Sequence, residues 1–170
     1  MSKRLSNIIR FVVLLAFQLL IVDNVRVGNY VHPCIYILFV MMLPLDMPKI
    51  NVLLCGFIMG FAIDLFTGTF GLNAAATTFI AFMRPWIIGL VTSGRNVENV
   101  SVPSIAEVGA VWFIRYSVVL ILLHNVVLFF LETFSFKLIG ETLIRILLST
   151  LISEVLILLI VLLFNKEKKR

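Results

Sequence analysis

The chain has 170 residues, of which 61% are hydrophobic and only 14% are charged, and its mean hydropathy is +1.12. A soluble domain of this length does not carry so much apolar surface, and the apolar residues come in long blocks, so the composition predicts an all-α, polytopic integral membrane protein. The net charge of +5 comes largely from the two basic ends of the chain, which is typical of the flanks of membrane spans and speaks against binding of nucleic acid.

Six apolar segments follow one another along the chain. The first follows a basic N-terminus and is interpreted as a retained helix, because no small-residue cleavage site comes after it. The second contains Pro33 and Pro44, so it either spans or forms a short or re-entrant element. The sequence predicts a single transmembrane domain over residues 1–170, with about six spans at residues 8–22, 31–45, 50–66, 71–91, 108–131 and 143–164.

The distribution of positive charge predicts the orientation of these spans. Both ends of the chain are basic, so both termini are expected in the cytoplasm, which requires an even number of crossings. The turn at residues 46–49 and the loop that carries Arg95 then lie inside. The loops near Arg26, between Asp64 and Asn73, and between Glu132 and Glu141 then lie outside.

A glycine stripe that contains a carboxylate lies at the end of the third segment. Residues four apart form a slowly drifting stripe on an α-helix, and small residues there allow close packing with another helix or with a partner's membrane span. Glycines at the end of the stripe would allow a tight turn. This predicted packing motif comprises Gly56, Gly60, Asp64, Gly68, Gly71 and Asn73.

Asp64 is expected at the outer face of the membrane, which favours packing, capping or docking over an ion site. The carboxylate could cap the N-terminus of the next helix, or it could pair with Arg145 at the start of the sixth span. A third alternative is that both side chains are hydrated at the interface, where an arginine can extend toward water.

Three ionisable residues are expected deeper in the membrane. Arg84 and Arg115 each lie seven residues from the cytoplasmic end of a span, roughly 10 Å deep, and Glu154 lies near the midplane. Charges at such depth need partners, so we predict a buried charge network of Arg84, Arg115 and Glu154. A structural ion pair is favoured there over a ligand or proton site.

The sequence lacks the signatures of an enzyme. It contains no Gly-x-Ser-x-Gly, no His-Glu-x-x-His and no phosphate-binding loop. Its two histidines and two cysteines have no metal-ligand or redox spacing. We therefore expect no catalytic residue, no metal and no cofactor.

The stretch Gly60-Phe61-Ala62-Ile63-Asp64-Leu65-Phe66-Thr67-Gly68-Thr69-Phe70-Gly71-Leu72-Asn73-Ala74-Ala75 resembles a known family. It is similar to the Gly-x-x-x-Asp-Leu-x-x-Gly-x-x-Gly-x-x-Ala pattern of the bacterial rod-shape-determining MreD family, of the Bacteroidetes type. The Arg84-Pro85-Trp86 element is similar to an Arg-Pro element of that branch. The length, the basic ends and the predicted spans extend the resemblance over the whole chain.

The resemblance implies a non-enzymatic scaffold of the elongasome, in the bacterial inner (cytoplasmic) membrane, that regulates cell shape and lateral peptidoglycan synthesis. It implies binding to an MreC-like single-span coiled-coil protein, in the neighbourhood of MreB, RodA, a class B transpeptidase and membrane lipids. Such chains also resemble the membrane subunits of energy-coupling-factor transporters. The implied fold is therefore that of such a subunit, and the alternative function is a substrate-binding membrane subunit of a vitamin-type transporter.

Overall fold

The computed structural model describes residues 3–24, 31–92, 100–133 and 139–164, and every regular element in these ranges is a helix. Helices α1, α3, α4, α6 and α7, with η1 extending α1, are long and apolar enough to cross a membrane. The prediction of an all-α, multi-pass membrane protein is thus confirmed. The elements are α1 (Lys3–Phe17), the π-helical turn η1 (Gln18–Val22), α2 (Ile37–Met41), α3 (Lys49–Thr67), α4 (Leu72–Val91), α5 (Ile105–Val108), α6 (Ala110–Thr133) and α7 (Ile139–Leu163).

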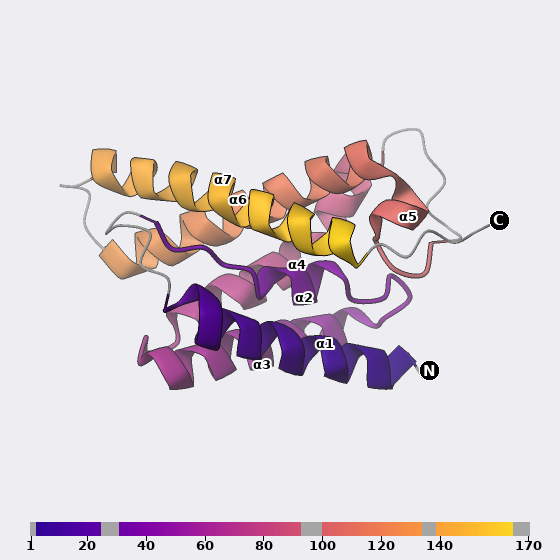
Figure 1. Ribbon diagram of the computed structural model, residues 1–170, viewed down its shortest axis with the longest axis horizontal. Helices are drawn as coiled ribbons and strands as arrows, with labels where there is room; N and C mark the ends of the chain where they lie inside the picture. The colour runs from indigo at the N-terminus through magenta and orange to yellow at the C-terminus, as the bar shows by residue number, and fades with distance from the viewer. Residues whose placement is uncertain (1–2, 25–30, 93–99, 134–138, 165–170) are drawn as a thin grey trace.

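The long helices run along the longest axis of the molecule (Figure 1). Helix α3 packs on α4, α4 packs on α6, and α6 packs on α7. Helix α1 begins and α7 ends at the same end of the bundle, which we call the terminal end (Figure 1). The turn between α3 and α4 lies at the opposite end, which we call the motif end.

Of the two alternatives predicted for residues 31–45, a spanning segment and a short element, the structure contains a short helix, although this stretch does pass along the bundle (Figure 1). Its only helix is α2, five residues long, and no regular structure precedes it at residues 31–34. The stretch, here called the central segment, runs inside the bundle from the motif end toward the terminal end (Figure 1). Pro33 lacks an N–H group and Pro44 interrupts any continuation of α2, so the chain cannot pair its own backbone as a helix would.

Burial among the other helices makes this irregular backbone tolerable. Residues 33–41 are all buried, and α2 contacts α1, α3, α4 and α6. In a membrane, non-helical backbone is stable only where protein groups replace the missing hydrogen bonds. Polar side chains on the surrounding helices are therefore required, and they form the candidate site.

The outer surface of the bundle is apolar. Leu147, Leu151 and Leu159 on α7, and Leu54, Ile58 and Leu65 on α3, point away from the interior and are exposed. The predicted spans other than 31–45 correspond to the long helices, and α1 and α7 begin earlier than predicted, at Lys3 and Ile139.

Candidate functional site

Asp64 joins the end of α3 to the start of α4. Its Oδ1 accepts hydrogen bonds from Thr69 Oγ1 at 2.5 Å and from both the backbone N and Nδ2 of Asn73 at 3.0 Å, and its Oδ2 accepts one from the Ala74 backbone N at 2.8 Å. The first N–H groups of a helix lack partners within it, and a carboxylate there also interacts favourably with the helix dipole. Of the roles left open by the sequence, the structure assigns Asp64 the capping of the next helix.

The glycine stripe brings the backbones of these two helices together. A Cβ atom on Gly60 would lie 2.4 Å from the carbonyl oxygen of Asn73, and one on Gly56 would lie 2.8 Å from the Cβ of Ala81. The predicted close packing is thus confirmed, with α4 of the same chain as the neighbour. Gly56 and Gly60 are consequently not available to a partner's membrane span.

The turn between the two helices contains three residues in the left-handed region. Gly68 ends α3 with φ of 71°, Gly71 precedes α4 with φ of 91°, and Phe70 between them has φ of 47°. The backbone N of Gly68 donates to the Asp64 carbonyl at 2.8 Å. A Cβ on Gly68 would meet no described atom within 4 Å, so a side chain there would act through backbone strain rather than through a clash.

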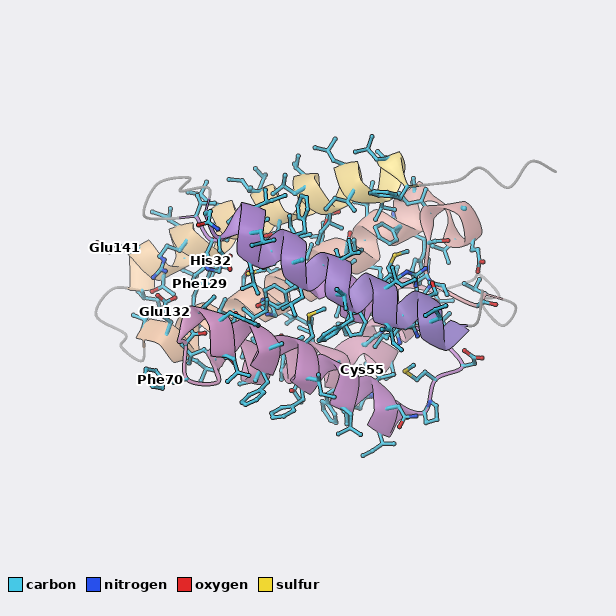
Figure 2. The ribbon with its side chains drawn as sticks, turned by 60° about the horizontal axis from the view of Figure 1, so that its bottom comes forward. His32, Cys55, Phe70, Phe129, Glu132 and Glu141 are labelled. Atoms are coloured by element: carbon cyan, nitrogen blue, oxygen red, sulfur yellow. The ribbon has the colours of Figure 1, made fainter. Side chains whose placement is uncertain are left out.

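Arg145 does not pair with Asp64, so the predicted outer pair is wrong. Its Nη2 lies 3.1 Å from Glu132 Oε1, and its guanidinium carbon lies 4.6 Å from the centre of the Phe129 ring. Figure 2 shows Glu132 and Phe129 at the end of α6. The first turn of α4 already occupies both Asp64 oxygens, and Arg145 on α7 faces the end of α6.

A double-mutant cycle tests this separation. Asp64→Asn should lower the free energy of unfolding by about 1–3 kcal/mol, because the amide that replaces one oxygen cannot accept from α4. Arg145→Gln should cost less than about 1 kcal/mol, since its ion pair is partly exposed. Unfolding of the two single variants and the double variant in detergent should give effects that add within about 0.5 kcal/mol. A larger coupling energy would show that Asp64 and Arg145 interact.

The motif connects to the interior through Asn73. Tyr36 donates its hydroxyl proton to Asn73 Oδ1 at 2.7 Å, and the same hydroxyl lies 3.0 Å from His124 Nε2. Because the hydroxyl proton is used on Asn73, His124 must carry its own proton on Nε2. Tyr36 and His124 are fully buried, and His124 Nδ1 has no partner among the described residues. Sequence reasoning missed this network, because nothing local relates Tyr36 to a histidine in α6.

Gln18 holds the first part of the central segment. It lies in the π-helical turn η1 and is completely buried. Its Nε2 donates to the Pro33 carbonyl at 3.0 Å, and its Oε1 accepts from the Ile35 backbone N at 2.9 Å. One amide side chain thus pairs an acceptor and a donor of the irregular backbone, in place of a helical hydrogen-bond ladder.

Two serines of α7 hold the same stretch from the other side. Ser149 Oγ accepts from the His32 backbone N at 3.0 Å, and Ser153 Oγ accepts from the Cys34 backbone N at 2.9 Å. Serines in membrane helices can hydrogen-bond to their own backbone or to a neighbouring element, and these two accept from the neighbouring central segment. Both serines are fully buried.

Arg84 holds the other end of the central segment. Its Nε donates to Tyr116 Oη at 2.9 Å, and its Nη2 donates to the carbonyls of Met41, at 3.5 Å, and of Leu43. Tyr116 in turn donates to the Met41 carbonyl at 3.2 Å. A cation at the end of α2 satisfies carbonyl groups that this short helix leaves free.

The predicted buried network of Arg84, Arg115 and Glu154 is therefore wrong. Arg115 is exposed, whereas Glu154 is buried and accepts a hydrogen bond from Ser117 Oγ at 2.7 Å. Arg115 and Ser117 are two residues apart on α6, so they point to nearly opposite sides of the helix. Arg84 and Glu154 are buried within the bundle, whereas position along a helix does not determine which face carries a residue.

Comparison with protein-family models, with curated proteins and with solved structures found no match for this chain. The resemblance to the MreD family and to the transporter subunit fold therefore remains a prediction from the motif. Within the described residues, no three histidine, cysteine, aspartate or glutamate side chains gather as metal ligands. Gln18, Ser149, Ser153 and Arg84 hydrogen-bond to the backbone of the central segment, which is a structural role.

Proposed function

We propose that this chain is a non-enzymatic scaffold of the bacterial elongasome, as its resemblance to the MreD family implies. One observation carries the proposal: the matched positions act together in a single joint. Gly60 allows α3 to touch α4, Asp64 caps α4, and Gly68 and Gly71 form the turn between them. Each matched position thus has a role that few other residues could fill, which supports a family pattern over a chance match.

The same joint displays an aromatic side chain at the motif end. Phe70 is fully exposed, and its positive φ is rare for a bulky residue (Figure 2). Such strain persists only where the surrounding structure imposes it, and it is common at functional positions. An aromatic ring fully exposed on a tight turn offers a large apolar surface that a partner can cover.

The predicted topology places the motif end outside the cytoplasmic membrane. The partner at Phe70 is then the outer part of an MreC-like single-span coiled-coil protein. The terminal end, with its basic residues, would face MreB, and RodA and a class B transpeptidase would be neighbours in the same assembly. In this role the bundle fixes the position of its partner and performs no chemistry.

A substrate-binding transporter subunit is the second candidate function. The observation in its favour is the discontinuous central segment, since transporters often form their binding sites where helices are broken. In this chain, however, the backbone groups freed by the break bind Gln18, Ser149, Ser153 and Arg84. That arrangement favours a structural role for the break.

Capture of partners from native host membranes tests the proposed function. Cross-linking, purification of the tagged chain and mass spectrometry should recover a single-span coiled-coil protein. Phe70→Ala should reduce its capture about tenfold or more, as expected for an aromatic anchor. Thermal unfolding in detergent should stay unchanged, because the ring is fully exposed.

Phe66→Ala is the matched control, because Phe66 is an exposed phenylalanine on the last turn of α3. It should leave capture unchanged. Equal capture by both variants would contradict the docking role of Phe70. Recovery of ATPase subunits with a small ligand would favour the transporter, and unchanged cell width and sites of wall insertion after depletion would contradict the scaffold.

A further inference from the structure

A pocket at the terminal end carries positive charge. It has a volume of about 340 Å³ and lies between the beginning of α3 and the last turns of α4. We call it the basic pocket, and its distinctive lining residues are Lys49, Arg84, Pro85 and Trp86. Among the described residues that line it, no carboxylate is present to balance the two cations.

The guanidinium of Arg84 is fixed before any ligand arrives. Its Nε and Nη2 are held by Tyr116 and by carbonyls of the central segment, and its described hydrogen bonds leave Nη1 unused. Arg84 is only 4% exposed, and it lines the basic pocket. An oriented arginine with an unused donor beside a lysine is well suited to bind a phosphate group.

An apolar groove continues from the basic pocket toward the motif end. Its volume is about 640 Å³, and it shares Leu53 and Phe82 with the basic pocket. Phe57, Phe61 and Phe79 line it, and Ala75 forms part of its floor. The groove lies on the outer face between α3 and α4, where most exposed side chains of α3 are apolar and the polar ones, Lys49, Asn51 and Thr67, lie near the helix ends. The two hollows together are charged at one end and apolar along the rest.

We propose that the basic pocket and the groove together bind one anionic phospholipid. Its phosphate contacts Lys49 and Arg84 Nη1, and one acyl chain lies in the groove between α3 and α4. Lys49 is the first residue of α3, so it lies near the level of the lipid headgroups at that end. Basic pockets between transmembrane helices recognise anionic headgroups in this way. A free phosphate would leave the apolar groove unused, and a neutral lipid would leave the cations without a counter-charge.

Native mass spectrometry of the purified chain in detergent tests this site, with dioleoyl phosphatidylglycerol and dioleoyl phosphatidylcholine as probes. The first phosphatidylglycerol should bind about fivefold more tightly than the first phosphatidylcholine. Lys49→Gln should remove that preference. Arg115→Gln is the matched control, because Arg115 is an exposed cation that lines a different groove with no second cation among its described lining residues. It should leave the preference intact.

A second variant tests the apolar part independently. Ala75→Phe places a ring in the groove from an exposed position on α4, and it should weaken binding of both lipids at this site several-fold. Thermal unfolding of the variant confirms that the bundle is retained. If the variant misfolds, the Lys49→Gln comparison decides alone.

Several outcomes would overturn the proposal. Equal affinity of the wild-type chain for the two lipids would do so, as would equal effects of Lys49→Gln and Arg115→Gln. Displacement of phosphatidylglycerol by inorganic phosphate, together with no effect of Ala75→Phe, would indicate a site for a free anion. Loss of partner capture in Ala75→Phe with unchanged lipid binding would indicate that a partner's helix occupies the groove. The outcomes for Lys49→Gln and Arg115→Gln do not bear on docking at Phe70, because the basic pocket lies at the other end of the bundle.

Discussion

Replacing Gly60 by alanine should prevent α3 from packing on α4. The added methyl carbon would lie 2.4 Å from the Asn73 carbonyl oxygen and 2.6 Å from the Ala74 Cα, both of them backbone atoms that cannot move without the helix. Separating the two helices would also withdraw Asp64 from the first turn of α4. We expect a loss of about 3 kcal/mol or more in the free energy of unfolding, at the upper end of overpacking effects. Thermal or denaturant unfolding in detergent measures it.

Gly89→Ala is the matched control on α4. A Cβ at that position would meet no described atom within 4 Å, so the methyl group costs no packing. Alanine is a better helix former than glycine, and a small gain of up to about 1 kcal/mol is expected. Equal stability of the Gly60→Ala and Gly89→Ala variants would show that α3 and α4 are not in close contact.

Gln18→Leu should destabilise the bundle by about 2–5 kcal/mol. Leucine has a similar size but cannot pair the Pro33 carbonyl or the Ile35 N–H, and both groups would then be buried without a partner. Each unsatisfied backbone group costs about 1–3 kcal/mol, and water is scarce at this depth to replace the amide. The readout is again the midpoint of unfolding in detergent.

Asn24→Leu controls for the loss of an amide. Asn24 also donates to backbone carbonyls, those of Leu19 and Leu20, but it is exposed at the end of η1, where water can replace it. Its loss should cost less than about 1 kcal/mol. Comparable effects of the two substitutions would mean that the central segment does not depend on Gln18.

Hydropathy predicted the long helices because lipid contact requires continuous apolar faces. Hydropathy did not decide the structure of residues 31–45, which are just as apolar but belong to the interior. The prolines indicated a break, yet the sequence left open whether the segment spans. The answer depends on Gln18, Ser149, Ser153 and Arg84, which lie on three other helices. Such pairings are set by the tertiary fold and leave no local periodicity.

The charged residues show the same difference between what the sequence predicts and what only the tertiary fold determines. The motif placed Asp64 beside a turn, so capping could be foreseen as one alternative, and the glycines next to it made the turn possible. The partners of Arg84 and Glu154 could not be foreseen. The spacing of residues indicates how far along a helix a side chain lies, but it indicates only poorly which neighbouring helix that side chain faces. The Tyr36–His124 contact joins residues 88 positions apart, and neither residue stands in a recognisable pattern.

The central segment also constrains the biosynthesis of the protein. The N–H groups of His32 and Cys34 find their acceptors 117 and 119 residues later in the chain, on α7. At about 10 residues per second, the ribosome needs on the order of ten seconds to make that stretch. Until then the segment cannot enter lipid without unpaired backbone groups, so it must wait in an aqueous or protein-lined environment. The packing of the central segment against α7 can thus be completed only after α7 has been synthesised.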